Sequence, residues 1–237
     1  MDIVKFCDEL SRVNLIDLSQ TLEEHMPHFP SHSKFFHNLW GSYWHGNRSL
    51  SYQLVMHEHN GTHVDAPAHF ISDAKPQAHV TIDQVSLTRL MGRGVRLDCR
   101  NFKGGEYVSK SFVTTWEAQH GSLKAGDIVL FDFDWAARWG IRPHDQRYLE
   151  SWPGVGMDAA EYLIEKSVDA LGVDTLSPDP PEALQNNPIH PVVLEKQILI
   201  IENLCNLDRV PDFFVFLALP LKIKAGSGSP IRAVALV

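Results

Sequence analysis

The chain has 237 residues, of which 44% are hydrophobic and 21% are charged, so it can bury a substantial core. This composition excludes disordered and fibrous proteins, and no apolar run is long enough to cross a bilayer as a helix. Asp and Glu number 29 against 21 Lys and Arg, a formal net charge of -8, which disfavours a general binder of phosphate backbones. We therefore expect a globular protein that acts on a small molecule and binds neither nucleic acid nor membrane.

Histidine is abundant and cysteine is scarce, with 13 His and only 3 Cys. The three cysteines are too few and too far apart for a disulfide scaffold or a thiolate zinc site. The first residues lack the basic segment and long apolar stretch of a secretory signal. We therefore predict a cytoplasmic protein whose histidines need a chemical explanation.

Hydrophobic periodicity in the first part of the chain predicts a helix, an extended segment, a loop and a half-buried strand, in that order. These elements cover residues 2–13, 14–18, 27–30 and 50–58. The strand alternates, so one face would pack on the core and the other would carry polar residues and histidines. The residues of its apolar face are Leu50, Tyr52, Leu54 and Met56.

The rest of the chain alternates between helical and strand patterns. Helices are predicted over residues 82–91, 109–120 and 158–166, the last opened by a capping box of Asp158 and Glu161. Strands are predicted over residues 95–98, 127–133, 168–174, 197–201, 213–219 and 231–237, with turns over 204–211 and 226–230. No repeat or linker divides the chain, which predicts one mixed α/β domain over residues 1–237.

Four histidines lie within residues 57–69, namely His57, His59, His63 and His69. A helix through this segment is disfavoured by Gly61 and by the proline that follows, so we predict a turn at Asn60-Gly61 and extended chain after it. In extended chain His63 and Asp65 project to the same side. The turn would bring His59 against them and complete a ligand set of two histidines and one aspartate.

Nitrogen and oxygen donors without thiolate suit zinc, manganese or another first-row dication. A catalytic metal keeps one position open for water, whose pKa falls to about 7 from about 15.7, so that hydroxide forms at neutral pH. His69 follows Asp65 by four residues, where a neutral imidazole could accept and return a proton.

Other histidines and aromatic residues have ordinary interpretations. Isolated histidines are usually surface or hydrogen-bonded core residues, and this holds for His25, His28, His79, His120 and His144. His57 is left out of the ligand set, as either an outer contact of the ligands or a strand surface residue. The aromatic-rich residues 35–44, and Trp135, Trp139 and Trp152, either form an apolar wall for an aromatic substrate or belong to the core or to subunit contacts.

Residues 59–70, HNGTHVDAPAHF, resemble the signature of the cyclase-like metal-dependent hydrolase family, which includes bacterial kynurenine formamidases and isatin hydrolases. The similarity continues along nearly the full length, at residues 16–19, 26–27, 172–175, 202–204, 220–223, 228–230 and 232–233. The resemblance implies the family's swivelling β/β/α fold, in which helices flank a mixed sheet. It also implies a homo-oligomer, either a homodimer or a homotetramer.

The resemblance also implies roles for six residues. In dinuclear members the first metal is held by the two histidines and the aspartate of the signature, and the aspartate bridges to a second metal held by a histidine and a glutamate twelve residues apart. The matching ligands here are His59, His63, Asp65, His190 and Glu202. On the residues alone, the last two would be an ordinary histidine and a strand-ending glutamate. The last histidine of the signature, His69, is the family's catalytic acid/base.

The implied activity is hydrolysis of a non-peptide amide or lactam C–N bond, of the arylformamidase or isatin hydrolase type. One or two Zn²⁺ or Mn²⁺ ions per subunit would supply the hydroxide that attacks the carbonyl of a small aromatic amide or lactam. Alternatives on the same residues are a lactone or polyketide cyclase-type enzyme, or a metal-binding protein without catalysis. An interaction module that uses exposed aromatic residues is a further alternative.

Overall fold

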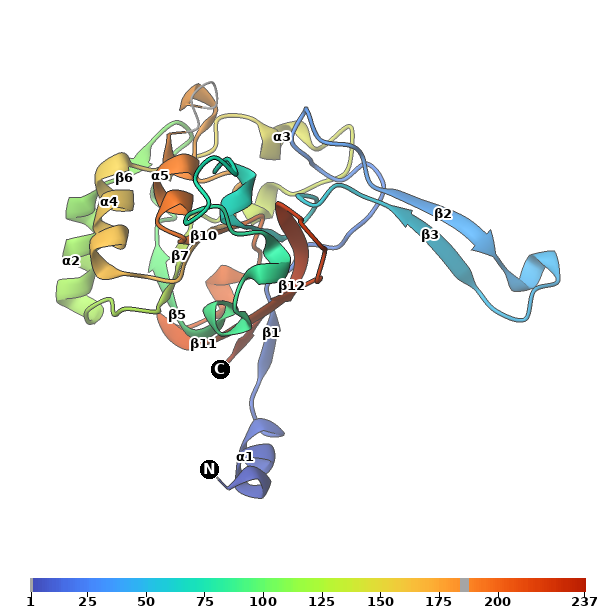
Figure 1. Ribbon diagram of the computed structural model, residues 1–237, viewed down its shortest axis with the longest axis horizontal. Helices are drawn as coiled ribbons and strands as arrows, with labels where there is room; N and C mark the ends of the chain where they lie inside the picture. Colours follow the sequence, from blue (N-terminus) through green and yellow to red (C-terminus); the bar gives the residue numbers. More distant parts are fainter. Residues whose placement is uncertain (1, 184–187) are drawn as a thin grey trace.

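The computed structural model describes residues 2–183 and 188–237, and its centre is an eight-stranded mixed sheet (Figure 1). The strands lie in the order β1-β12-β11-β5-β7-β9-β10-β4. Their bounds are β1 Leu15–Asp17, β4 His63–Asp65, β5 Met91–Asp98, β7 Ile128–Asp132, β9 Ala170–Val173, β10 Leu199–Glu202, β11 Phe213–Pro220 and β12 Gly228–Leu236. Because β4 pairs with both β10 and β12, seven of these strands form a closed ring and β1 lies outside it.

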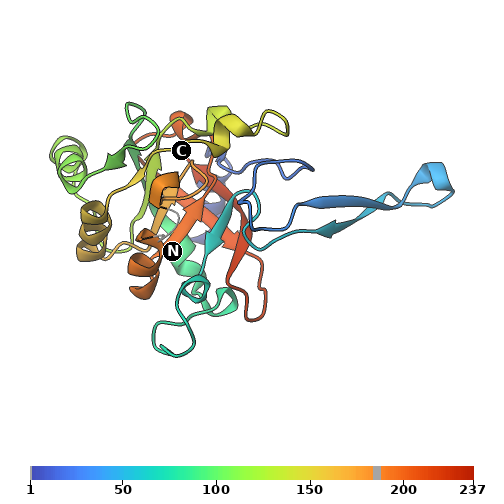
Figure 2. The same ribbon diagram turned by 90° about the horizontal axis from the view of Figure 1, so that it is seen from above.

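Three helices cover the parallel part of the sheet, which consists of β5, β7, β9 and β10 (Figures 1 and 2). They are α2 Lys110–His120, α4 Met157–Lys166 and α5 Ile189–Glu195. The short α3 Gln146–Leu149 and the N-terminal α1 Ile3–Leu10 complete the helices among the described residues. Ser109 caps α2 by accepting a hydrogen bond from the amide of Phe112, as expected of a serine at a helix start.

Alternation along the central strands divides the buried side chains into two cores. On β7, Val129 and Phe131 pack in the cluster beneath the helices, whereas Ile128 and Leu130 belong to the cluster enclosed by the ring of strands. Both faces of this strand are buried, which is the usual condition of a parallel strand covered on both sides. The fold prediction of a mixed α/β sheet flanked by helices is confirmed, while one domain over residues 1–237 stays a prediction.

A two-stranded hairpin projects away from the body of the molecule (Figures 1 and 2). It consists of β2 Phe36–Gly41 and β3 Ser51–Val55, paired in antiparallel fashion, together with the residues 42–50 that join them, and we call it the arm. A second small pair joins β6 Tyr107–Val108 to β8 Gly154–Val155. Single 3₁₀ turns cover Tyr43–His45, Pro67–His69, Ile82–Gln84, Leu87–Leu90, Ala136–Arg138, Pro181–Ala183 and Leu207–Arg209.

Three local predictions were wrong. Residues 82–91 form two separate 3₁₀ turns instead of a helix, because Val85 between them is extended and β5 begins at Met91. The predicted capping box at Asp158 is absent, since Gly156 occupies the N-cap of α4. The strand predicted over residues 50–58 is present as β3, but its predicted half-burial is wrong, because β3 lies in the arm and is exposed throughout.

Candidate metal centre

The segment that carries the signature folds as a tight turn followed by β4. Gly61 has a positive φ of 63°, and a Cβ at this position would come within 2.4 Å of the side chain of Leu22, so the turn favours glycine here. Asn60 closes the turn by accepting the amide hydrogen of His57 at 2.7 Å. The predicted turn and the extended chain after it are confirmed.

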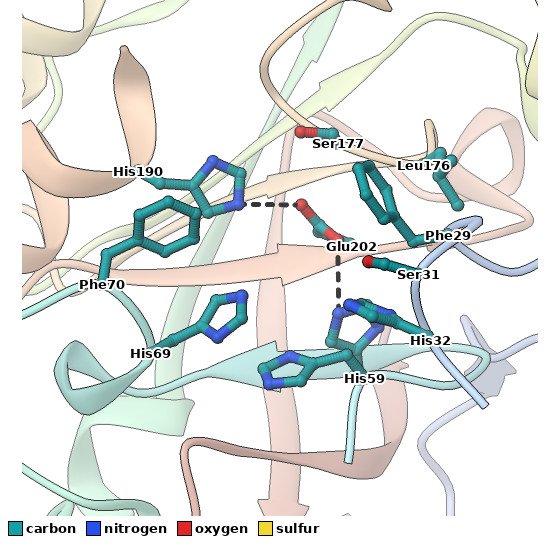
Figure 3. A pocket seen from close by; sticks show the side chains of 11 residues that line it. Phe29, Ser31, His32, His59, His69, Phe70, Leu176, Ser177, His190 and Glu202 are labelled. Carbon is teal, nitrogen blue, oxygen red and sulfur yellow. Dashed lines mark ion pairs between the residues drawn. The ribbon is translucent and has the colours of Figure 1, made fainter. Parts of the chain in front are cut away.

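Strand pairing and α5 bring the acidic and imidazole side chains together (Figure 3). Glu202 lies opposite His63 in the antiparallel pair of β10 and β4, and the two side chains are 3.2 Å apart from Oε2 to Nε2. His190 reaches in from α5, with its Nε2 3.3 Å from Oε1 of Glu202. Asp65 lies between them, with Oδ1 3.4 Å from Nε2 of His63 and Oδ2 3.5 Å from Nε2 of His190.

The five side chains predicted as ligands therefore converge on one point, and each is at most 7% exposed. Two groups of donor atoms lie within 4.8 Å of one another, one from His63, Asp65 and Glu202 and the other from His59, Asp65 and His69. The family resemblance implies a different grouping, with His59, His63 and Asp65 on one metal. In the structure, Glu202 instead neighbours His63, and His69 neighbours His59. Asp65 belongs to both groups, as a bridging carboxylate would.

The charges of this cluster are strongly coupled. Burial alone would lower the pKa of His63, but hydrogen bonds to Asp65 and Glu202 outweigh it and raise the pKa to about 10. Burial would likewise raise the pKa of the two carboxyl groups, yet the neighbouring histidines hold both below their ordinary values. Oε1 of Glu202 is buried and accepts no hydrogen bond from the described residues. Buried imidazoles around two carboxylates, one of which has an oxygen without a hydrogen bond among the described residues, fit a divalent metal ion.

Outer hydrogen bonds fix which nitrogen two of the histidines present. Nδ1 of His63 donates to the carbonyl of Gly61 at 2.9 Å, and Nδ1 of His190 donates to Oδ2 of Asp179 at 2.6 Å. Asp179 is fully buried and also accepts the amide hydrogen of Ile189, so it ties the histidine to the start of α5. Both imidazoles therefore present Nε2 to the carboxylates, in the carboxylate–histidine arrangement common at metal sites.

His69 lies at the end of the 3₁₀ turn that follows β4, with its ring stacked 4.0 Å from that of His59. Burial lowers its pKa to about 4, although the charge of Asp65 opposes the shift. Its ring nitrogens form no hydrogen bond with the residues that the structure describes. A neutral imidazole that faces the pocket without a partner is able to accept a proton at neutral pH.

A pocket of about 200 Å³ opens over the cluster (Figure 3). Besides the histidines and Glu202, it is lined by Phe29, Ser31, His32, Phe70, Leu176 and Ser177. Two phenyl rings thus provide the apolar wall, and they come from segments other than the aromatic-rich residues 35–44. Those residues lie mostly in the arm, and the three tryptophans singled out from the sequence do not line the pocket.

No pattern in the sequence marks His32 as a pocket residue, because the arm separates it from the signature along the chain. Its ring stacks 4.0 Å from that of His57, and burial together with His57 and His59 lowers its pKa to about 3. His57 accepts the amide hydrogen of His59 at its Nδ1 and does not belong to either donor group. It is therefore an outer contact of the cluster, one of the two roles left open for it.

Comparison with known proteins gives this cluster a family context. The family model described as "Putative cyclase" matches residues 16–180, more than half of the chain. An isatin hydrolase of Roseibium aggregatum is 32% identical over 194 residues, which cover 78% of this chain and 73% of that protein. A kynurenine formamidase of Erythrobacter litoralis is 30% identical over 226 residues, which cover 94% of each.

Solved structures agree with the sequence matches. Isatin hydrolase A from Labrenzia aggregata, in a complex with benzyl benzoate, superposes with a TM-score of 0.91 at 27% identity, covering 100% of this chain and 99% of that one. Isatin hydrolase A from Ralstonia solanacearum superposes with a TM-score of 0.88 at 28% identity, covering 100% and 97%. The fold implied by the resemblance is thereby confirmed. The chain belongs to the cyclase family of metal-dependent hydrolases.

Proposed function

We propose that this protein is a metal-dependent hydrolase of non-peptide amide or lactam C–N bonds. The observation that carries the proposal is the convergence of His59, His63, Asp65, His190 and Glu202 beneath a pocket that His69 also faces. The relatives named isatin hydrolase and kynurenine formamidase support the same bond type.

The proposed ligands would hold one or two divalent ions, Zn²⁺ or Mn²⁺. When bound, such an ion would lower the pKa of its water and polarise the substrate carbonyl. The two oxygens of Asp65 face different histidines, Oδ1 toward His59 and His63 and Oδ2 toward His190, which favours a bridging role. Because oxygen and nitrogen donors suit both metals, their identity has to be measured.

His69 would serve as general acid and base. As a neutral imidazole it takes the proton of the attacking water and then gives that proton to the leaving nitrogen. Phe29 and Phe70 flank the pocket and would accept the apolar face of a small aromatic substrate. Burial of the site excludes bulk water from the developing charge on the carbonyl oxygen.

A substrate panel on metal-free protein resupplied with either zinc or manganese tests the proposal. N-formylkynurenine and isatin represent the formamide and the lactam, and an aryl lactone represents the alternative ring-opening chemistry. Hydrolysis of either nitrogen substrate that depends on added metal is the expected result. Turnover of the lactone alone would instead favour the cyclase-type alternative, and no turnover with metal bound would favour a binding protein.

We also propose that the chain is cytoplasmic and forms a homodimer or homotetramer. Among the described residues no helix is long and apolar enough to span a membrane. The arm supports self-association, because it exposes large apolar side chains far from the body of its own chain. These residues include Leu39, Trp40, Tyr43, Trp44, Tyr52 and Leu54.

A further inference from the structure

A Gly-Ser-Gly segment, residues 226–228, contacts both Glu58 and His59. The backbone amide and the hydroxyl of Ser227 donate to Oε2 of Glu58 at 2.9 and 2.7 Å. The same hydroxyl oxygen lies 2.9 Å from Nε2 of His59. Each glycine allows close approach, since a Cβ at Gly226 would lie 2.8 Å from Oε1 of Glu58 and one at Gly228 would lie 2.5 Å from Cε1 of His59.

The direction of these hydrogen bonds determines the tautomer of His59. Ser227 has a single hydroxyl hydrogen and donates it to Glu58, so its oxygen can only accept from His59. Nε2 of His59 therefore carries a hydrogen that points away from the cluster. Nδ1 is the nitrogen that faces Asp65, 2.6 Å from its Oδ1.

This arrangement is the reverse of that at the other two histidines. His63 and His190 donate from Nδ1 to their outer partners and present Nε2 to the carboxylates. We propose that Glu58 and Ser227 are positioning residues, which orient His59 so that it binds the metal through Nδ1 while His63 and His190 bind through Nε2. The proposal rests on the metal site of the proposed function and adds a role for two residues outside the ligand set.

The role has a clear physical basis. Outer partners of metal-binding histidines fix the ring orientation and raise the basicity of the ligating nitrogen, and their loss typically weakens metal binding about 10–100-fold. Ser227 is placed just before β12, where Gly228 pairs with Asp65, so the hydroxyl is fixed relative to the ligand strand. Glu58 in turn fixes the hydroxyl hydrogen, because it accepts from both polar groups of Ser227.

Metal affinity of the full chain tests the proposal without a substrate. In competition titrations of Zn²⁺ against a chelator, Ser227→Ala should bind about 10–100-fold more weakly than the wild-type protein. Glu58→Gln should show a smaller loss, because an amide oxygen still accepts the Ser227 hydrogens. Ser229→Ala is the matched control, since within residues 2–183 and 188–237 its hydroxyl bonds only the amide of Leu221 and the carbonyl of Pro230. The control should keep wild-type affinity.

The tautomers give a second readout that a general structural role would not produce. In zinc-loaded protein with ¹⁵N-labelled histidine, two-bond ¹H–¹⁵N correlations should show hydrogen on Nε2 of His59 and on Nδ1 of His63 and His190. Hydrogen on Nδ1 of His59, or wild-type zinc affinity in Ser227→Ala, would overturn the proposal alone. Absence of both zinc and manganese binding by the wild-type protein would overturn the proposed function as well, so the two failures are distinguishable.

Discussion

At the scale of single residues, His69 differs from its neighbours in having no outer hydrogen-bond partner among the described residues. We predict that His69→Ala lowers kcat by about 10²–10⁴-fold, the usual contribution of a general acid or base. Zinc affinity should change little, because the five proposed ligands remain. Turnover and zinc titration on the same preparation measure both effects.

Other results for His69→Ala are also informative, because His69 lies beside His59 and Asp65 in one donor group. Loss of metal together with activity would make this histidine a ligand. Unchanged turnover would remove it from the chemistry altogether.

The lowered pKa of His69 predicts how the stability of metal-free protein depends on pH. Between pH 6.5 and about 4, a histidine in the unfolded chain binds a proton while the buried His69 does not, so the free energy of unfolding falls as the pH falls. The raised pKa of His63 affects the free energy of unfolding over a different pH range. Its stabilising contribution is complete below pH 6.5 and is lost as the pH rises toward about 10.

Urea unfolding at pH 6.5 and pH 4.5 tests this dependence. For one such group, a change of two pH units alters the free energy of unfolding by on the order of 2 kcal/mol. His69→Gln should therefore lose less stability over this interval than the wild-type protein. An equal loss in both proteins would show that His69 does not titrate as the structure indicates.

The sequence predicted the candidate site where its residues are adjacent and lacked the signal where they are not. The turn, β4 and the projection of His63 and Asp65 to one side follow from local chain geometry, since they depend only on a glycine and on the alternation of an extended strand. Asp179 and Ser227 act through hydrogen bonds that long-range packing creates, so no local spacing marks them. His32 likewise lines the pocket from a segment that the arm separates from the signature along the chain.

At the scale of elements, β4 joins the metal ligands to the closure of the ring of strands. Three residues pair on one side with β10 and on the other with β12, and the ends of β4 carry His63 and Asp65. Without a cation, the buried carboxylates and imidazoles rely only on each other for charge compensation. A bound metal would add stability to this pairing, by an amount that grows with the logarithm of its affinity.

We predict that removing the metal increases amide hydrogen exchange in peptides that contain β4 by about tenfold or more. Peptides that contain β7, which lies away from the ligands, should change little and serve as the internal control. Hydrogen exchange of the metal-loaded and chelator-treated protein, followed by mass spectrometry, makes the comparison. Uniform acceleration of both strands would mean that the metal stabilises the whole fold instead of this pairing.

The elements also separate what periodicity can predict from what it cannot. The predicted strands over residues 127–133 and 213–219 correspond to β7 and β11 because each is a continuous apolar run with turns on both sides. Residues 82–91 also have helical spacing, but Val85 is extended and two short turns form instead. The alternation in β3 correctly predicts a strand, yet alternation alone does not tell whether its apolar face packs on the same chain.

At the scale of the whole molecule, the arm is the feature that the fold of one chain does not explain. A lone two-stranded hairpin is marginally stable in water, and Trp40 and Trp44 are 77% and 80% exposed. We predict that the double variant Trp40→Ser and Trp44→Ser shifts the protein toward the monomer in sedimentation velocity. Zinc affinity should be unchanged, since neither residue lines the pocket.

Tyr107→Ser is a suitable control because it removes an exposed aromatic ring on β6 instead of one in the arm. The control should sediment like the wild-type protein. A double arm variant that also sediments like the wild type would place the subunit contact elsewhere, or show that the chain acts alone.

The position of β4 also has a consequence for synthesis of the chain. Its residues leave the ribosome early, but their partners on β10 and β12 belong to the last part of the sequence. During translation the histidines of the signature therefore remain without Glu202 until most of the chain has been made. A prematurely terminated chain that contains the whole signature but not β10 would lack Glu202. Metal binding by the complete set of ligands therefore requires a chain that has been translated past β10.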